Sequence, residues 1–333
     1  MQISGNYMTS IKDKKFLVTG TAGFIGMHVA RKLLQEGAAV IGIDNFNDYY
    51  DVSVKEGRHS QLEECKNYFG YRADLCDYDK LSSIFSENDF DVVIHLAAQA
   101  GVRYSLEHPF AYLKSNLEAF LNLLEMVRHN GPQRFVYASS SSVYGANKKL
   151  PFSEQDSVDT PVSLYAATKK ADELMAYTYM HLYDIQTIGL RFFTVYGPWG
   201  RPDMAMWIFA DKISRGETIS VYNYGEMQRD FTFIDDIVDG VINSAIKSDL
   251  DQYEIFNLGN HRSEKLMDLI AEIEKGIGKK ADCSYEPIQP GDVPATYADI
   301  DRAADKLDFK PETPLSKGVP IFIDWFKKYH GLD

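Results

Sequence analysis

The sequence predicts an α/β fold in which a doubly wound parallel sheet is followed by a smaller C-terminal lobe. Short apolar runs alternate with amphipathic stretches through the first half of the chain, which is the rhythm of strands and helices in βαβ units. The runs are nearly continuous, as expected of strands covered on both faces. After about Gly197 proline and glycine become frequent and the elements become shorter, which indicates the second lobe.

Each apolar run is assigned to a strand by its length and its Val, Ile and Leu content. The expected strands are 15–20, 39–43, 68–73, 91–96, 134–138 and 186–192. The expected helices are 23–35, 109–130, 164–183, 204–215, 237–247, 264–277 and 316–329. We therefore assign 14–196 to the sheet domain, with 230–260 returning to it, and 197–333 mainly to a lobe that closes over a substrate.

Composition excludes several classes of protein. The net charge of -13 and pI of about 5.1 argue against a nucleic-acid partner, which usually meets a basic surface. No apolar run approaches the length needed to span a membrane. The eight histidines show no metal-binding spacing, so no metal is expected. Residues 1–13 are polar, lack the apolar core of a signal peptide, and are expected to form a loose end.

The three cysteines, Cys65, Cys76 and Cys283, are odd in number and far apart, without a CxxC pair. This pattern predicts neither a disulfide framework nor a zinc site. It fits a reducing, cytoplasmic location.

A glycine-rich turn joins the first expected strand to the first expected helix: Gly20-Thr21-Ala22-Gly23-Phe24-Ile25-Gly26. Such glycines allow a tight turn and a close backbone approach to a pyrophosphate, which the helix N-terminus then faces. Asp44 ends the next strand, where a carboxylate bonds ribose hydroxyls and repels a 2′-phosphate. We therefore predict NAD rather than NADP, with Asn45 in the same site. The alternative is an ordinary glycine-rich turn.

Two further strand ends are assigned to the cofactor site. Asp74, followed by Leu75, could accept a hydrogen bond from the adenine amino group, or could instead cap the helix that follows Cys76. The segment Leu96-Ala97-Ala98 carries small side chains that let the backbone approach the cofactor. With the preceding residues, these complete a NAD-binding Rossmann domain.

Tyr165 and Lys169 form a YxxxK pair, which shares one face of a helix. An ammonium beside a phenol stabilises phenolate, which can then take a proton from a sugar hydroxyl. Taken alone, such a pair is usually surface packing. Upstream, however, a strand ends in the serines 139–142, and ligands of doubly wound sheets bind at such carboxyl ends.

These motifs resemble the extended short-chain dehydrogenase/reductases over nearly the whole chain. Within them, three segments resemble the UDP-glucuronate 4-epimerases: Asp44–Tyr50, Pro161–Lys170 and Arg191–Met204. The resemblance implies that Tyr165 is the catalytic base and that Ser140 assists proton transfer. It also implies that Lys169 holds the ribose and tunes the tyrosine, and that the chain forms a homodimer. The two long helices, 109–130 and 164–183, would pair with their copies, or could be covered within one chain.

Relatives with other chemistry fit less well. Dehydratases carry an acidic pair near the serine stretch, and decarboxylases a glutamate where Ser142 stands; this stretch holds no carboxylate. Galactose-type epimerases show asparagine at the position of Thr194, which argues against a neutral sugar.

A UDP-hexuronate carries a diphosphate and a carboxylate, which arginine forks bind well. The candidates are Arg103, Arg201 and Arg229, each of which could also be a solvated surface residue. The resemblance implies that Arg229 serves the diphosphate or uridine ribose. It also implies that Arg201, with Ser141, Ser142 and Thr194, holds the sugar carboxylate. Asp292 is assigned to the uridine end.

The sequence therefore predicts a NAD-dependent 4-epimerase that interconverts UDP-glucuronate and UDP-galacturonate through a 4-keto sugar. The first alternative is a 4-epimerase of UDP-glucose or UDP-N-acetylglucosamine. A UDP-hexuronate decarboxylase fits less well, as does a non-catalytic NAD-binding protein, which would be expected to lack Tyr165 or Lys169.

Overall fold

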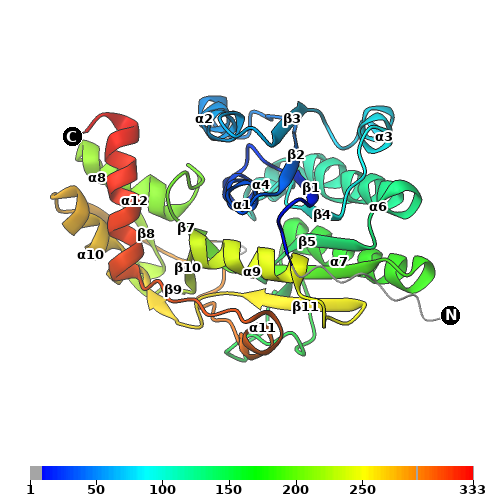
Figure 1. The fold of residues 1–333 in the computed structure, drawn as a ribbon. Coiled ribbons are helices and arrows are strands. Elements are labelled where there is room, and N and C mark those ends of the chain that lie inside the picture. The colour runs from blue at the N-terminus through cyan, green and yellow to red at the C-terminus, as the bar shows by residue number, and fades with distance from the viewer. Residues whose placement is uncertain (1–9, 290–291, 333) are drawn as a thin grey trace.

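A computed structural model describes residues 10–289 and 292–332 of the chain. The predicted loose end at residues 1–13 therefore lies, through Thr9, outside the described residues. The main body is a seven-stranded parallel sheet of order β11-β6-β5-β4-β1-β2-β3 (Figure 1). Its strands are β1 Lys15–Thr19, β2 Ala39–Asp44, β3 Tyr68–Arg72, β4 Val92–His95, β5 Arg134–Ser140, β6 Gln186–Phe192 and β11 Tyr253–Leu258.

The order of the strands places the site. β1 pairs with β2 on one side and with β4 on the other, so the chain direction across the sheet reverses at β1. The connections that follow β1 and β4 therefore lie on opposite faces, and they leave a crevice beyond the carboxyl ends of these strands. Every strand of the sheet points the same way, so all the strand-end residues predicted above meet at one edge.

Helices cover both faces of this sheet. Side chains of β1 alternate between them: Phe16 and Val18 join the core under α1 (Phe24–Gln35) and α9 (Ile234–Ile246). Leu17 joins the opposite core, under α3 (Tyr78–Ser86), α6 (Ala119–Asn130) and α7 (Leu164–Tyr183). α2 (Val52–Glu63) packs beside α1 and β3, and α11 (Asp301–Leu307) beside β11. No helix among the described residues is long and apolar enough to cross a membrane.

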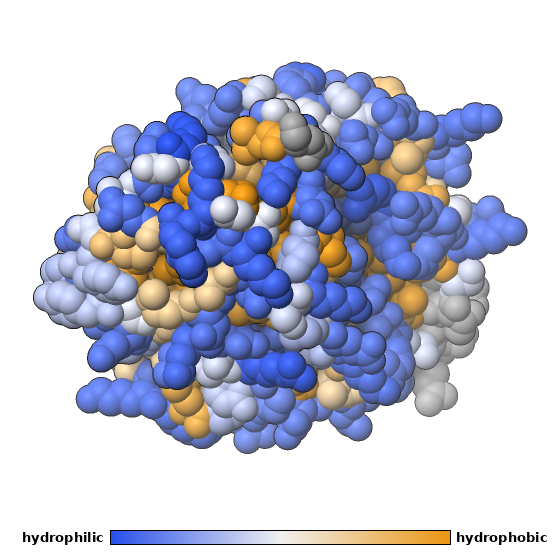
Figure 2. Space-filling view, turned by 90° about the vertical axis from the view of Figure 1, so that its left-hand side faces the viewer, coloured by the Kyte–Doolittle hydropathy of each residue, from blue (hydrophilic) through white to orange (hydrophobic). Residues whose placement is uncertain are grey.

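The second lobe lies at the left of Figure 1. It contains the helices α8 (Ala205–Arg215), α10 (Leu266–Ile277) and α12 (Leu315–His330), and three small two-stranded sheets lie in it or join it to the main body. The sheets pair β7 (Thr194–Tyr196) with β10 (Phe231–Phe233), β8 (Ile219–Tyr222) with β13 (Cys283–Glu286), and β9 (Gln228–Arg229) with β12 (Glu264–Lys265). A 3-10 turn, η3 (Asn223–Gly225), follows β8. Figure 2 shows this side of the molecule, where hydrophilic side chains predominate and apolar ones form smaller patches between them.

One predicted helix is wrong in detail. The segment 109–130 is not one α-helix but α5 (Pro109–Tyr112), a π-helical turn η1 (Leu113–Glu118) and α6, preceded by a short α4 (Tyr104–Glu107). Asn116, in the π-turn, is buried and accepts a hydrogen bond from the Gln99 backbone N–H at 2.8 Å. Such wide turns concentrate at functional sites, and here the turn brings Asn116 onto the strand end.

Other differences are smaller. β5 ends at Ser140, and the next serines lie in a 3-10 turn, η2 (Ser141–Tyr144), rather than in the strand. α9 begins three residues earlier than predicted, with Asp235 and Asp236 in its first turn, where carboxylates are favoured. Residues 264–265 belong to β12, so α10 begins at Leu266.

Candidate active site

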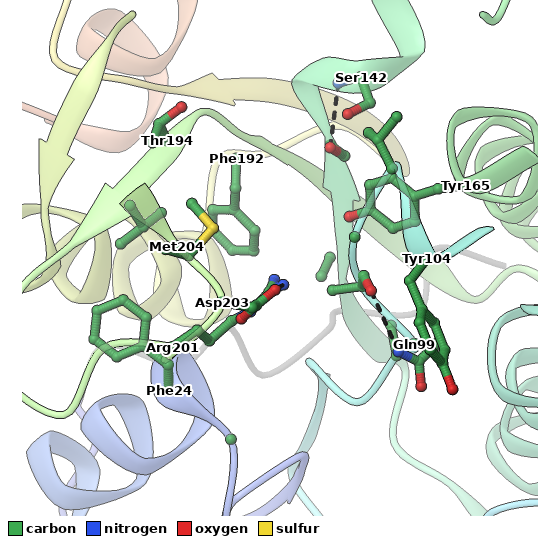
Figure 3. A pocket seen from close by; sticks show the side chains of 18 of the residues that line it. Phe24, Gln99, Tyr104, Ser142, Tyr165, Phe192, Thr194, Arg201, Asp203 and Met204 are labelled. Atoms are coloured by element: carbon green, nitrogen blue, oxygen red, sulfur yellow. Dashed lines mark hydrogen bonds and ion pairs between the residues drawn. The ribbon is translucent and has the colours of Figure 1, made fainter. Parts of the chain in front are cut away.

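A cavity of about 850 Å³ lies along the carboxyl ends of the sheet strands and is bounded on its other side by the second lobe. Figure 3 shows part of its lining, with Tyr165 on one side and Arg201, Asp203 and Thr194 on the other. The structure brings together every residue that the sequence assigned to a site. These are Gly20, Gly23, Phe24, Ile25, Gly26, Asp44, Asn45, Asp74, Leu75, Leu96, Ala97, Ala98, Arg103, Ser140, Ser141, Ser142, Tyr165, Lys169, Thr194, Arg201, Arg229 and Asp292.

The turn between β1 and α1 requires its glycines. A Cβ on Gly26 would lie 2.0 Å from the carbonyl oxygen of Gly20, and one on Gly20 would lie 2.8 Å from the backbone nitrogen of Ala97. Gly20 also has a φ of +76°, which disfavours other residues. α1 then begins without a side-chain cap. The backbone therefore stays open to a close-lying phosphate, and the first N–H groups of α1 remain available to it.

Asp44 is positioned for a sugar. Its two carboxylate oxygens accept hydrogen bonds from the backbone N–H groups of Ala22, at 3.0 Å, and Phe46, at 2.8 Å. A carboxylate can accept about four hydrogen bonds, so capacity remains for the ribose hydroxyls of a nucleotide in the cavity. The open turn and this anchored carboxylate fit the adenosine half of NAD.

Asp74 lies beside Asn45, whose amide donates to its carboxylate at 2.9 Å. The other oxygen of Asp74 accepts from the backbone N–H of Cys76 at 2.8 Å. Burial acts to raise the pKa of Asp74, but these bonds hold it below its ordinary value. Asp74 does not cap the helix that follows, because Asp77 caps α3 by accepting from the backbone N–H of Lys80.

Tyr165 is half-buried in the first turn of α7, which Ser163 caps at its N-terminus. Four residues on, Lys169 is buried and its ammonium donates to Asp172 and to the carbonyl oxygen of Ala138, each at 3.0 Å. Among the described residues, no hydrogen bond joins Lys169 to the phenol of Tyr165. Both predicted residues thus line the cavity, but the ammonium of Lys169 donates to Asp172 and not to the phenol of Tyr165.

Asp172 is a residue that the sequence did not single out. It is fully buried, and burial raises its pKa to about 7, although Lys169 opposes that shift. Its second carboxylate oxygen has no hydrogen-bond partner within the described part of the chain. In the sequence it looks like any other polar residue on a helix, so only its depth in the fold reveals it.

A buried ion pair supports the serine turn. Glu173 of α7 accepts two hydrogen bonds from Arg191 of β6, at 2.8 and 2.9 Å, and one from the hydroxyl of Ser139 at 2.7 Å. In the turn itself, the hydroxyl of Ser140 accepts from the backbone N–H of Ser142 at 3.2 Å. This network fixes the point at which β5 turns into η2, and so it positions Ser140, Ser141 and Ser142 in the lining of the cavity.

Arg201 projects into the cavity from the loop between β7 and α8 (Figure 3). Its Nε donates to Asp203 at 3.0 Å, and its Nη2 donates to the second oxygen of the same carboxylate. Asp203 also accepts from the hydroxyl of Tyr49 at 2.9 Å. Burial acts to raise the pKa of Asp203, but Arg201 and then Tyr49 hold it below its ordinary value.

Arg58 of α2, which is fully buried, holds the loop that carries Arg201 in place by hydrogen bonds. Arg58 donates to the carbonyl oxygens of Trp199, at 3.0 Å, and Gly200, at 2.9 Å. It also donates to the carbonyl oxygen of Ala22 in the glycine-rich turn, at 3.1 Å. The same guanidinium therefore connects the cofactor side of the cavity to the arginine loop.

The outer end of the cavity contains the other two predicted arginines. Arg103 is exposed and donates to Asp292 at 3.2 Å. Arg229, in β9, donates to the carbonyl oxygens of Gln228, at 2.8 Å, and Pro294, at 3.2 Å. Burial lowers the pKa of Arg229, and Asp292 opposes that shift. These groups form a mixed-charge rim of the cavity. No cluster of histidine, cysteine and carboxylate groups that could hold a metal occurs in residues 10–289 and 292–332.

Comparison with known sequences identifies relatives along nearly the whole chain. Residues 16–259 match the sequence model of the NAD dependent epimerase/dehydratase family. Protein CapI of Staphylococcus aureus is 49% identical over 332 residues, covering 95% of this chain and 99% of the relative. The probable UDP-glucuronate 4-epimerase of Rhizobium meliloti is 43% identical over 329 residues, covering 94% of this chain and 96% of the relative.

Two solved structures share the fold. The UDP-glucuronic acid 4-epimerase of Bacillus cereus, in complex with UDP-glucuronic acid and NAD, superposes with a TM-score of 0.88 at 34% identity. The UDP-glucose 4-epimerase of Thermotoga maritima, with UDP-glucose, gives a TM-score of 0.86 at 30% identity. Each alignment covers 95% of this chain and 99% of the other. These comparisons confirm the predicted resemblance and the predicted α/β fold.

A pH-dependent contact fixes the arginine loop at a second point. His28 is buried in α1, where its Nδ1 accepts from Arg31 at 3.0 Å and its Nε2 therefore donates to the carbonyl oxygen of Pro198 at 2.9 Å. Burial, reinforced by Arg31, lowers the pKa of His28 to about 3. Only the neutral imidazole can make both bonds.

We expect this histidine to reduce stability in acid. Between pH 6.5 and 3 the unfolded chain binds a proton at His28 that the folded chain does not, so stability falls as the pH is lowered. From pH 7 to 5 the wild type should lose about 2 kcal/mol more free energy of unfolding than His28→Gln, which keeps one donor and one acceptor. Urea unfolding at the two pH values measures the difference. His181→Gln, at an exposed position, should follow the wild type; parallel curves for all three proteins would contradict the expectation.

Proposed function

The chain belongs to the NAD-dependent epimerase/dehydratase family, and we propose that it interconverts UDP-glucuronate and UDP-galacturonate by epimerisation at C4. One observation carries the proposal. A single cavity presents a tyrosine on a serine-lined wall and, facing it, an arginine held on a fixed loop. The first arrangement suits a sugar hydroxyl that must lose a proton, and the second suits a sugar carboxylate.

NAD is the proposed cofactor, and the glycine-rich turn and Asp44 are the residues that would hold its adenosine and pyrophosphate. Asn45 and Asp74, joined by a hydrogen bond, would accept the adenine end, and the small residues after β4 would leave room for the backbone to approach. When bound, NAD supplies the chemistry of removing and returning hydride at a carbinol carbon. Lys169 has one N–H left after its two bonds, and this donor would serve the ribose.

Tyr165 is the group that would accept and return the proton. Its phenol would accept the proton of the sugar 4-hydroxyl, with Ser140 as the neighbouring hydroxyl that assists the transfer. The resulting 4-keto sugar would turn about its diphosphate linkage and present its other face. Tyr165 would then return the proton to the C4 oxygen, because the same group must serve both directions of a reversible step. The cycle consumes no net oxidant or reductant.

We propose that residues 197–333 mainly form the substrate-binding lobe, while 14–196 and the returning segment 230–260 form the cofactor domain. β11 supports the returning segment, because it pairs with β6 at the edge of the main sheet. Arg229 would bind the diphosphate or the uridine ribose. Arg103 and Asp292, which are joined by an ion pair at the rim, would bind the uridine end.

The carboxylate of the sugar needs a particular restraint. A 4-keto uronate is a β-keto acid: when its C5–C6 bond breaks, the electron pair passes into the C4 carbonyl as an enolate and carbon dioxide leaves. The bond breaks readily only when it overlaps the carbonyl π system. We propose that Arg201, Ser141, Ser142 and Thr194 hold the carboxylate away from that alignment.

One observation favours the alternative of a neutral UDP-hexose or UDP-N-acetylhexosamine. Asp203 neutralises Arg201, which weakens the long-range attraction for a carboxylate. The 30% identity to a UDP-glucose 4-epimerase is compatible with that reading. Comparing the rates of conversion of UDP-glucuronate and of neutral UDP-sugars separates the two proposals.

We propose two further properties, a cytoplasmic location and a homodimer. The free state of all three cysteines fits a reducing compartment. Exposed apolar side chains lie on α5, η1, α6 and α7: Phe110, Leu113, Leu121, Leu174 and Tyr177. These helices pack beside one another and lie away from the second lobe (Figure 1). A second copy of the same face is the occupant proposed for this surface.

Substrate preference tests the proposed function. The purified protein should convert UDP-glucuronate with a kcat/KM roughly a hundredfold or more above those for UDP-glucose and UDP-N-acetylglucosamine, because a site built for a carboxylate leaves polar groups unpaired with a neutral sugar. Chromatography of the products measures this ratio. Conversion of a neutral sugar alone would favour the alternative.

Removing the arginine tests the restraint on the carboxylate. Arg201→Met should lower kcat/KM for UDP-glucuronate by roughly a hundredfold, since a charged hydrogen-bond donor is lost. It should also raise the fraction of decarboxylated product, measured as released carbon dioxide. Arg215→Met, at an exposed arginine of α8, is the matched control. An Arg201 variant with unchanged turnover and unchanged by-product would refute the restraint.

The mass in solution tests the dimer. The protein should sediment as a dimer, and Leu174→Glu on the exposed face of α7 should give a monomer, because it places a charge in an apolar interface. Ile321→Glu, at another exposed apolar position, on α12, should leave the mass unchanged. A monomeric wild type would exclude the proposed interface.

A further inference from the structure

We propose that Asp203 is a positioning residue that sets the direction in which Arg201 meets the sugar carboxylate, and so determines the preference for a uronate. The inference rests on the proposed function, since it takes Arg201 to be the partner of that carboxylate. Asp203 itself bonds Arg201 and not the substrate.

The hydrogen bonds of Arg201 leave one edge of its guanidinium free. The group has five N–H donors in one plane. Asp203 engages one donor on Nε and one on Nη2, which is the side of the fork next to the side-chain stem. Nη1 donates to no residue in the described part of the chain, and Arg201 lines the cavity. The Nη1–Nη2 edge is therefore available to a second carboxylate.

Asp203 is itself fixed, so the direction of that edge is fixed as well. Its carboxylate accepts from Tyr49 at 2.9 Å. The ring of Tyr49 packs edge-on against Tyr104, with 4.7 Å between centroids. Gly101 lies beside the Tyr49 hydroxyl, where a Cβ would approach it to 2.7 Å. Tyr49 comes from the loop after β2, so the cofactor domain holds a carboxylate of the substrate lobe in place.

This arrangement changes what Arg201 recognises. An unpaired arginine would attract any anion and would lose much side-chain entropy when it ordered around one. Arg201 and Asp203 together carry little net charge, and the pair already orders the guanidinium. It then selects a ligand by the direction of two parallel N–H donors, which match the two oxygens of a carboxylate. A neutral hydroxymethyl group offers no such pair of acceptors.

The test replaces the carboxylate by an amide of the same shape. Asp203→Asn should raise KM for UDP-glucuronate about tenfold, with a smaller change in kcat, because an amide can accept from only one of the two arginine donors. The decarboxylated fraction of product should rise as well. The affinity for UDP, which lacks the sugar, should stay within a factor of two. A merely structural role would change UDP affinity and unfolding midpoint along with KM.

Two further variants keep the test decisive. Asp203→Glu should recover part of the lost KM because it restores a two-oxygen partner. Tyr49→Phe removes the hydroxyl that donates to Asp203 and should raise KM in the same direction by a smaller factor. It replaces Asp203→Asn as the test if that variant does not fold. Asp211→Asn, which breaks an ion pair on the exposed side of α8, should leave KM unchanged.

The outcomes distinguish this inference from the proposed function. A wild type that does not convert UDP-glucuronate removes the proposed function itself. A wild type that converts it, with Asp203→Asn and Tyr49→Phe both within a factor of two in KM or with a lower KM, overturns only the role of Asp203. A raised KM in both variants with retained UDP affinity supports that role.

Discussion

The buried guanidinium of Arg58 is the interaction on which the shape of the cavity depends. It donates to the glycine-rich turn at Ala22 and to the arginine loop at Trp199 and Gly200, and to the hydroxyl of Tyr50 between them. All four acceptors are neutral. A buried charge without a carboxylate partner is costly and persists only when its hydrogen bonds are satisfied. A movement of one loop relative to the other would therefore break at least one of these bonds.

The hydrogen bonds of Arg58 explain why the cavity has two chemically different sides, one from the sheet and one from the arginine loop. Strand order alone places the glycine-rich turn and the serines of β5 at one edge, because parallel strands end together. It does not place Arg201, which lies on a separate lobe. Arg58, together with the contact from His28 to Pro198, brings the arginine loop to that edge. Tyr49 and Asp203 then orient the guanidinium within the cavity.

The parts that the sequence predicts best are those governed by local pattern. The segments 164–183 and 186–192 were predicted to the residue, and Ser163, a residue type that favours helix starts, stands directly before the first of them. The glycine spacing located the turn after β1, because the close backbone contacts that require glycine there lie mostly within a few residues of one another. α2 escaped prediction because its buried side includes Lys55, Arg58 and His59, so hydrophobic periodicity is absent.

What the sequence could not supply are contacts between distant segments. Asp172 and Asp203 each stand two or three residues from a predicted site residue, yet nothing in their spacing says that they hold it. Asn116 interrupts a helix whose pattern looks continuous, because its partners on Gln99 and Thr168 lie elsewhere in the chain. Arg58 looks like a surface arginine until three loops are seen around it. Such residues are recognised from tertiary hydrogen bonds, for which a single sequence carries no local signal.

The most direct test of the central claim follows an isotope through the reaction. UDP-glucuronate labelled with deuterium at C4 is incubated with the purified protein, first without and then with added NAD. The UDP-sugars are separated, and the deuterium content of each is measured by mass spectrometry. A redox-neutral epimerisation within one cavity predicts UDP-galacturonate that keeps its deuterium at C4. Product that has lost the deuterium to solvent, or no product from intact protein even with NAD, would contradict the account.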